Sequence, residues 1–177
     1  MVEEIVFKIF LFILIMAYGL TRVPFMKKCK SSSTIKRKNR FFEKFKVFIA
    51  WLGMFFFPMI YIFSDFFKSF NMNLPDYIRV IGLLGMIADC VFFHYIHKEL
   101  DKNWSPVLEI RENHKLIKTG IYKFIRHPMY LQIWLWVVLQ FIIVYNWFGG
   151  ILGILTWAFV NFSRVGSEEK LMLVEFG

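Results

Sequence analysis

The sequence predicts an all-α integral membrane protein, a single membrane-embedded domain over residues 1–177 with about five transmembrane helices. Hydrophobic residues make up 58% of the chain and aromatic residues 20%, with 23 phenylalanines, whereas soluble domains are usually about 45–50% apolar. Several apolar runs approach the roughly 20 residues that cross a bilayer core. Isolated spans must be helices, because lipid leaves no partner for unpaired backbone groups.

Each predicted helix is an apolar run, and residues that kink a helix, open it or form a turn mark its course and its ends. Pro58 should kink the second helix. Pro75 and Asp76 should open the third, following the turn-forming residues NMNL. The stretch YNWFGG predicts a tight turn between the last two helices. The predicted spans are 5–23, 47–67, 77–96, 130–147 and 148–162.

The positive charges predict the orientation. The net charge of +9 could indicate nucleic-acid binding, but the lysines and arginines fall between apolar runs. Ten lie in residues 22–46, seven in 98–126 and two after residue 163, which leaves three of the 22 for the other side. The positive-inside rule assigns these nineteen to the cytoplasm. We therefore expect a multi-pass protein with its N-terminus outside, and a basic cytoplasmic loop at 22–46 resting on anionic lipids.

The N-terminus predicts no cleaved signal peptide, and the two cysteines predict no disulfide. Glu3 and Glu4 precede an apolar run that is too long for a signal peptide. Cys29 lies in a basic stretch and Cys90 in an apolar run, so the sequence predicts no disulfide.

The segment 98–128 is long and polar for a connection between spans. It ends in Arg126, His127 and Pro128. Each residue also has an ordinary explanation: one more cytoplasmic positive charge, an interfacial polar group, and the first residue of a helix. The tripeptide alone therefore does not establish a site.

The length of the last helical hairpin predicts that the segment 98–128 lies close to the segment that begins at Arg164. From residue 129 to 165 the chain has 37 residues, and two helices of about 18 residues each cover about 27 Å, one membrane thickness. The chain must return to the face it left. Arg164, Glu168 and Glu169 are therefore expected beside Arg126 and His127. An alternative reading makes Ser167 a helix N-cap and the two glutamates its first turn.

Asp89 and His94 in the third span and His97 just after it could form a proton relay or a metal site. A single carboxylate with two histidines near a helix end is more typical of packed polar contacts. We predict no metal.

The ordered series HKLIKTGIYKFIRHPMY, about forty mostly apolar residues, and then R-x-x-x-E-E resembles the isoprenylcysteine carboxyl methyltransferase family. The preceding NWS adds to the likeness, which covers residues 100–177. The resemblance implies an S-adenosylmethionine site at the cytoplasmic face, with S-adenosylhomocysteine as product, built from the segments 98–128 and 164–177. It implies that Arg164 holds the acceptor carboxylate. It implies cofactor contacts from His114, Lys115, Leu116, Ile117, Tyr122, Arg126, His127, Pro128, Met129 and Glu168.

The sequence departs from the family pattern in three places. Gln132 stands where many members have glycine after Arg-His-Pro-x-Tyr-x, and we expect it to reshape the floor of the pocket. Asp101 replaces the glycine of a Leu-Gly-x-x-Trp-Ser pattern. Relatives continue with a Tyr-rich tail beyond the final EFG, so we expect a C-terminal tail to be missing.

The resemblance implies methyl transfer to the carboxylate of a prenylcysteine-like lipidic acceptor. Two alternatives stay open: N-methylation of a phospholipid or other lipid amine, and a non-catalytic membrane subunit or transporter. The expected partners are membrane lipids and an amphipathic acceptor, without nucleic acid. The identity of the acceptor and the oligomeric state do not follow from the sequence.

Overall fold

A computed structural model describes residues 4–30, 34–37, 40–107, 109–111 and 117–176. It is all-α apart from one short two-stranded ribbon, as predicted. Four of its helical spans are long and apolar enough to cross a membrane, and α5 is a shorter apolar helix. The helices are α1 (Glu4–Lys30), α2 (Arg40–Trp51), the π-helix η1 (Leu52–Phe56), α3 (Phe57–Phe63), α4 (Asp76–Leu100), α5 (Pro128–Val144) and α6 (Trp147–Phe176). The shorter elements are the 3-10 helices η2 (Lys68–Phe70), η3 (Asp101–Asn103) and η4 (Gly120–Lys123), and the strands β1 (Thr34–Arg37) and β2 (Glu109–Arg111).

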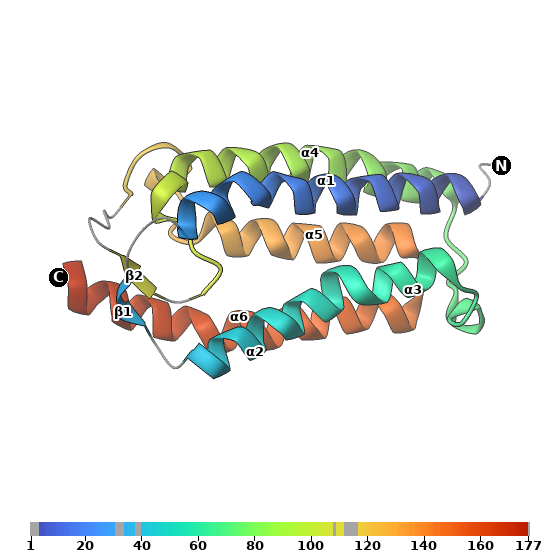
Figure 1. The fold of residues 1–177 in the computed structure, drawn as a ribbon. Coiled ribbons are helices and arrows are strands. Elements are labelled where there is room, and N and C mark those ends of the chain that lie inside the picture. The colour runs from blue at the N-terminus through green and yellow to red at the C-terminus, as the bar shows by residue number, and fades with distance from the viewer. Residues whose placement is uncertain (1–3, 31–33, 38–39, 108, 112–116, 177) are drawn as a thin grey trace.

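The helices form two groups that are joined at one end (Figure 1). Helices α1, α4 and α5 pack together, and α6 packs against both α5 and the α2–η1–α3 span. In Figure 1 the two groups lie close together near the N-terminus and separate toward the end that carries β1 and β2. The strands β1 and β2 and the last turns of α6 lie at this open end.

Buried polar residues fix the end where the groups meet. Arg79 is 4% exposed and donates to the carbonyl of Ile143 at 3.1 and 3.2 Å, which satisfies a backbone group near the end of α5. Tyr145 follows α5 with φ of 42°. The side chain of the buried Asn146 then accepts from the backbone N–H of Gly149 at 3.0 Å and caps α6. The predicted tight turn is confirmed, and it spans only residues 145–146.

Several helix ends differ from the prediction. Helix α1 continues through Pro24 to Lys30, and α2 begins at Arg40, so the segment 22–46 is not one basic loop. Lysine and arginine are good helix formers, and they extend the spans beyond the apolar runs. Strand β1 pairs antiparallel with β2 and ties this segment to 98–128. Before Pro58 the helix widens to the π-turn η1.

Helix α6 is a single helix of 30 residues. The acidic pair therefore lies inside a continuous helix, and Ser167 is not an N-cap. At about 1.5 Å per residue α6 is about 45 Å long, against about 26 Å for the 17 residues of α5. The excess carries the last turns of α6, with its charged residues, past the start of α5.

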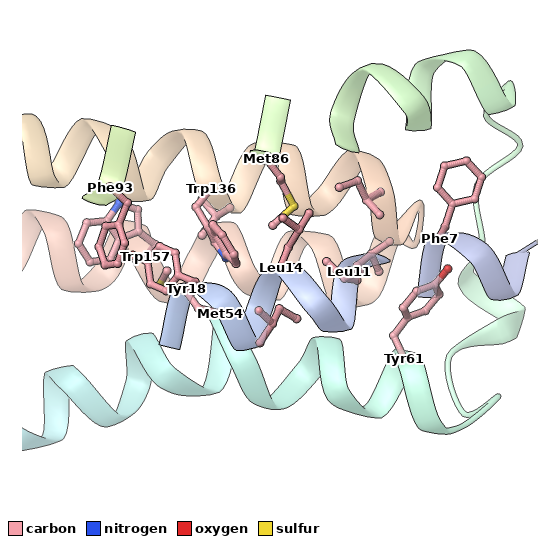
Figure 2. Packing of buried hydrophobic residues seen from close by; sticks show 14 of the residues in the cluster. Phe7, Leu11, Leu14, Tyr18, Met54, Tyr61, Met86, Phe93, Trp136 and Trp157 are labelled. Carbon is pink, nitrogen blue, oxygen red and sulfur yellow. The ribbon is translucent and has the colours of Figure 1, made fainter. Parts of the chain in front are cut away.

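The core lies between the helices along the closed half of the bundle (Figure 2). Its largest buried side chains include Phe7, Leu11, Met86 and Trp136. Many other large apolar side chains are exposed on the outer faces of the helices, for example Leu20 at 64% and Leu84 at 61%. Such outward apolar surface is what a lipid environment requires.

Candidate functional site

A cleft of about 630 Å³ opens between the two helix groups. Its volume is in the range of small-molecule sites. One part of its lining is charged, from the 98–128 segment and the last turns of α6, and the remainder is aromatic and aliphatic. The charged and polar lining residues include Arg22, Asn103, Ser105, Lys118, Tyr122, Arg126, His127, Arg164, Glu168 and Glu169. The apolar ones include Val47, Ala50, Trp51, Met54, Phe55, Phe93, Met129, Ile133, Trp157 and Val160.

Two contacts join the start of α5 to the last turns of α6. His127 Nε2 lies 3.3 Å from Glu169 Oε1. Tyr130, one turn into α5, donates its hydroxyl hydrogen to Glu168 Oε2. The predicted convergence of residues some forty positions apart is therefore confirmed. Glu168 is half-buried and held in one direction, whereas Glu169 is more exposed.

Arg164 lies on the wall of the cleft and is held from two sides. Its Nη1 donates to the carbonyl of Pro106 at 3.2 Å. Its Nε forms an ion pair with Glu43 Oε2 at 3.4 Å. The Glu43 carboxylate is almost fully buried, and its other oxygen accepts from Lys46 Nζ at 3.0 Å. Two cations thus compensate one buried carboxylate, as a buried charge requires.

Tyr122 lines the cleft from η4, just after Gly120. Gly120 has φ of 56°, and a Cβ there would lie 2.5 Å from a Glu99 carboxylate oxygen, so this turn favours glycine. Burial raises the pKa of the Tyr122 phenol, and the charges of Glu168 and Glu99 raise it further. The phenol therefore stays protonated at neutral pH and remains a hydrogen-bond donor.

The cleft contains every predicted site residue that the structure describes. These residues are Ile117, Tyr122, Arg126, His127, Pro128, Met129, Arg164 and Glu168. The other predicted positions, His114, Lys115 and Leu116, lie outside the described residues.

The sequence interpretation did not assign a site role to several lining or supporting residues. Glu43 is one of them, and the only signal for it was a single acid within a basic, aromatic stretch, FFEKFK. Arg22 is another, and its guanidinium lies 5.2 Å from the ring centre of Trp104. Trp104 is itself buried against His97, with the two ring centres 4.8 Å apart. Tyr18 belongs to the apolar part of the lining.

Two of the three departures from the family pattern can be followed in the structure. The expectation that Gln132 reshapes the floor of the pocket stays a prediction: the residue is fully buried and is not among those that line the cleft, so it does not form the floor itself. It acts through Tyr18, whose hydroxyl donates to Gln132 Oε1 at 3.2 Å. Asp101 has φ of 42°, a conformation that favours glycine. Its carboxylate forms an ion pair with Lys28 Nζ at 2.5 Å, which links η3 to the end of α1.

The polar residues of α4 do not form one cluster. Asp89 is buried and accepts from Gln132 Nε2 at 2.6 Å. His97 is buried and its Nδ1 contacts the Phe93 carbonyl at 3.0 Å, whereas His94 is exposed. Among the residues that the structure describes, no group of three or more histidines, cysteines and carboxylates could hold a metal.

The fold and this cleft define a class of protein. It is a multi-pass membrane protein whose helices enclose an apolar cleft capped by clustered cations and carboxylates. Such a lining suits an amphipathic ligand together with a small polar one.

Comparison with known proteins gives the family. The model of the isoprenylcysteine carboxyl methyltransferase family matches residues 80–174, more than half of the chain. The chain is 27% identical over 129 residues to the protein-S-isoprenylcysteine O-methyltransferase of Dictyostelium discoideum. That alignment covers 72% of this chain and 49% of the relative, so the chain spans about half the length of the curated relative it matches. The chain belongs to the isoprenylcysteine carboxyl methyltransferase family.

Proposed function

We propose that this protein is a membrane methyltransferase that uses S-adenosylmethionine to methylate the carboxylate of a prenylcysteine-like lipidic acceptor. One observation carries the proposal: the two polar segments that the family pattern marks meet in a single cleft, joined by His127 and Glu169 at 3.3 Å. The same cleft continues into an apolar part. A charged methyl donor and an apolar tail thus find complementary surfaces in one space.

The lining fits the chemistry of S-adenosylmethionine. Its carboxylate needs cationic donors, which Arg126 and His127 provide at the rim. Its amino and hydroxyl groups need acceptors, which Glu168 provides in an orientation set by Tyr130. Apolar side chains at the start of α5 and the ring of Tyr122 suit an adenine. His114, Lys115 and Leu116 join this proposed set through the family pattern alone.

When bound, S-adenosylmethionine supplies a methyl group on a positively charged sulfur. The role we propose for Arg164 is to hold the acceptor carboxylate, as a planar guanidinium does by two parallel hydrogen bonds. No residue needs to remove a proton, because a carboxylate is already ionised at neutral pH. The contribution of the protein is orientation and exclusion of water, and orientation alone supplies about 7–11 kcal/mol in well-aligned reactions.

The proposed orientation places the cleft at the cytoplasmic face with the N-terminus outside. The basis is the charge distribution, since the described parts of the basic segments 22–46 and 98–126, among them the end of α1, β1, the start of α2 and β2, lie at the open end of the bundle. Lys8, Lys68 and Arg79 are associated with the opposite, closed end. The positive-inside rule favours this orientation.

The test is methyl transfer by the purified full chain in lipid nanodiscs. Labelled S-adenosylmethionine and a farnesyl cysteine should give a product whose label is released by mild base, as from a methyl ester. Arg164→Ala should abolish this product, while the control Lys68→Ala, a cation at the opposite end, should not. A base-stable product on a lipid amine, or no product from a folded sample, would contradict the proposal.

A further inference from the structure

The apolar part of the cleft ends against a layer of packed side chains about halfway along the bundle. Tyr18, Met54, Phe93 and Trp157 are buried and line the cleft. Figure 2 shows these four near one end of the cluster, with Trp136, Met86, Leu14 and Leu11 following toward the other end. None of these following residues lines the cleft. The layer therefore separates the cleft from the filled core.

Tyr18 is the member of this layer that polar contacts hold in place. Its hydroxyl donates to Gln132 Oε1 at 3.2 Å, and Gln132 Nε2 donates to Asp89 Oδ2 at 2.6 Å. All three residues are at most 3% exposed. A buried polar group without a partner is costly, so these contacts fix the conformation of Tyr18 and Gln132. Among the described residues, the other carboxylate oxygen of Asp89, Oδ1, has no hydrogen-bond partner.

Ring contacts hold Tyr18 from both sides. Its ring stacks on Phe93 with centroids 3.8 Å apart and planes at 12°. The ring of Trp136 lies behind it, with centroids 4.2 Å apart. The phenol is therefore fixed in position and orientation between the cleft and the core residues Trp136, Met86, Leu14 and Leu11, which do not line the cleft.

We propose that Tyr18, held by Gln132 and Asp89, is a specificity-determining residue that limits the length of the apolar tail the cleft accepts. This inference rests on the proposed function, because it takes the apolar part of the cleft as the site of the acceptor's tail. The ring closes the end of the cleft opposite the charged residues of the 98–128 segment and of α6, while Arg22 lines the cleft one turn away on α1. An isoprenoid chain whose carboxylate reaches Arg164 would thus meet Tyr18 with its far end.

The experiment compares geranyl, farnesyl and geranylgeranyl thioethers of N-acetylcysteine on wild type, Tyr18→Ala and Tyr18→Phe. Binding is followed by tryptophan fluorescence, since Trp51 and Trp157 line the cleft, and methyl transfer is measured in parallel. Tyr18→Ala should raise the preference for geranylgeranyl over farnesyl by about tenfold, the scale on which apolar pockets discriminate added carbons. Tyr18→Phe keeps the ring but loses the hydroxyl contact, and should relax the length limit partly.

Leu14→Ala is the matched control, because Leu14 is a buried residue one turn away on α1 that does not line the cleft. It should leave the preference at the wild-type value. An unchanged preference in a folded Tyr18→Ala, or the same change in Leu14→Ala, would overturn the inference. So would the absence of binding by all three thioethers. Length-dependent binding without methyl transfer would support the role of Tyr18 and contradict the proposed function instead.

Discussion

The substitution Glu43→Gln tests the ion-pair group that holds Arg164. Glu43 is 1% exposed and compensates two cations, Lys46 at 3.0 Å and Arg164 at 3.4 Å. Glutamine keeps the shape and removes the charge. The contact with Lys46 is a hydrogen bond, which contributes about 1.5–3 kcal/mol with a charged partner and about 0.5–1.5 kcal/mol with a neutral one, so Lys46 loses on the order of 1 kcal/mol. The contact with Arg164 is an ion pair in which neither Arg164 Nε nor Glu43 Oε2 has a hydrogen-bond partner among the described residues, so Arg164 loses its charge attraction alone.

The total loss should be smaller than that of a fully buried pair. Breaking such a pair costs about 3–5 kcal/mol, but the side chains of Arg164 and Lys46 remain 12% and 15% exposed, so water relieves part of the penalty. We expect Glu43→Gln to lower the free energy of unfolding by about 1–3 kcal/mol. Released from Glu43, Arg164 should also hold the acceptor less well, which should lower kcat/KM for the acceptor about tenfold, equivalent to about 1.4 kcal/mol.

The assay is thermal unfolding in nanodiscs together with steady-state kinetics for acceptor and cofactor. Glu4→Gln is the control, because Glu4 also pairs with a lysine, Lys8 at 3.5 Å, but is 40% exposed at the far end of the chain. Exposed pairs contribute about 0–1 kcal/mol, so this variant should resemble wild type in both measurements. A Glu43→Gln variant with wild-type unfolding and wild-type acceptor kinetics would refute the assigned role of Glu43.

Three further predictions concern packing, ionisation and proximity. Gly53→Ala should destabilise the protein by about 1–3 kcal/mol in thermal unfolding, because a Cβ at Gly53 would clash with Thr156 Oγ1. A stability equal to that of wild type would contradict the close approach of η1 and α6. Tyr122→Phe should leave the shape of the pH–rate profile unchanged up to about pH 10, the ordinary pKa of tyrosine, because burial raises the pKa of Tyr122. If the substitution removed a titration step below pH 10, the phenol would ionise earlier than this prediction allows. In a background without the native cysteines, His127→Cys with Glu169→Cys should be cross-linked by a short bifunctional maleimide, because the tips of the two longer native side chains are 3.3 Å apart, and a pair that is not cross-linked would place α5 and α6 differently.

The sequence was sufficient for the features that depend on membrane thickness. The lengths of the last two apolar runs required Arg164 and Glu168 to return to the face of Arg126, and the contacts of α5 with α6 confirm it. No tertiary packing had to be known for this step, because two helices of membrane length can only form a hairpin.

The features that depend on packing between distant helices could not be predicted. Glu43 meets Arg164 only because α2 packs on α6, and nothing in the local sequence fixes that contact. Gln132 was expected to reshape the pocket floor from its position in a motif, but its buried contacts with Asp89 and Tyr18 could not be predicted. The helical continuation through Pro24 was also missed, because the apolar pattern ends before it while the helix continues.

The central claim is that the segments around Arg126 and Glu168 form one binding site for S-adenosylmethionine. Calorimetric titration of S-adenosylmethionine into the full chain in nanodiscs tests it most directly. Wild type should bind, and Arg126→Ala and Glu168→Gln should each weaken binding about tenfold or more, the loss of one charge-assisted hydrogen bond. A folded protein that gives no binding heat, or both variants binding as tightly as wild type, would contradict the account.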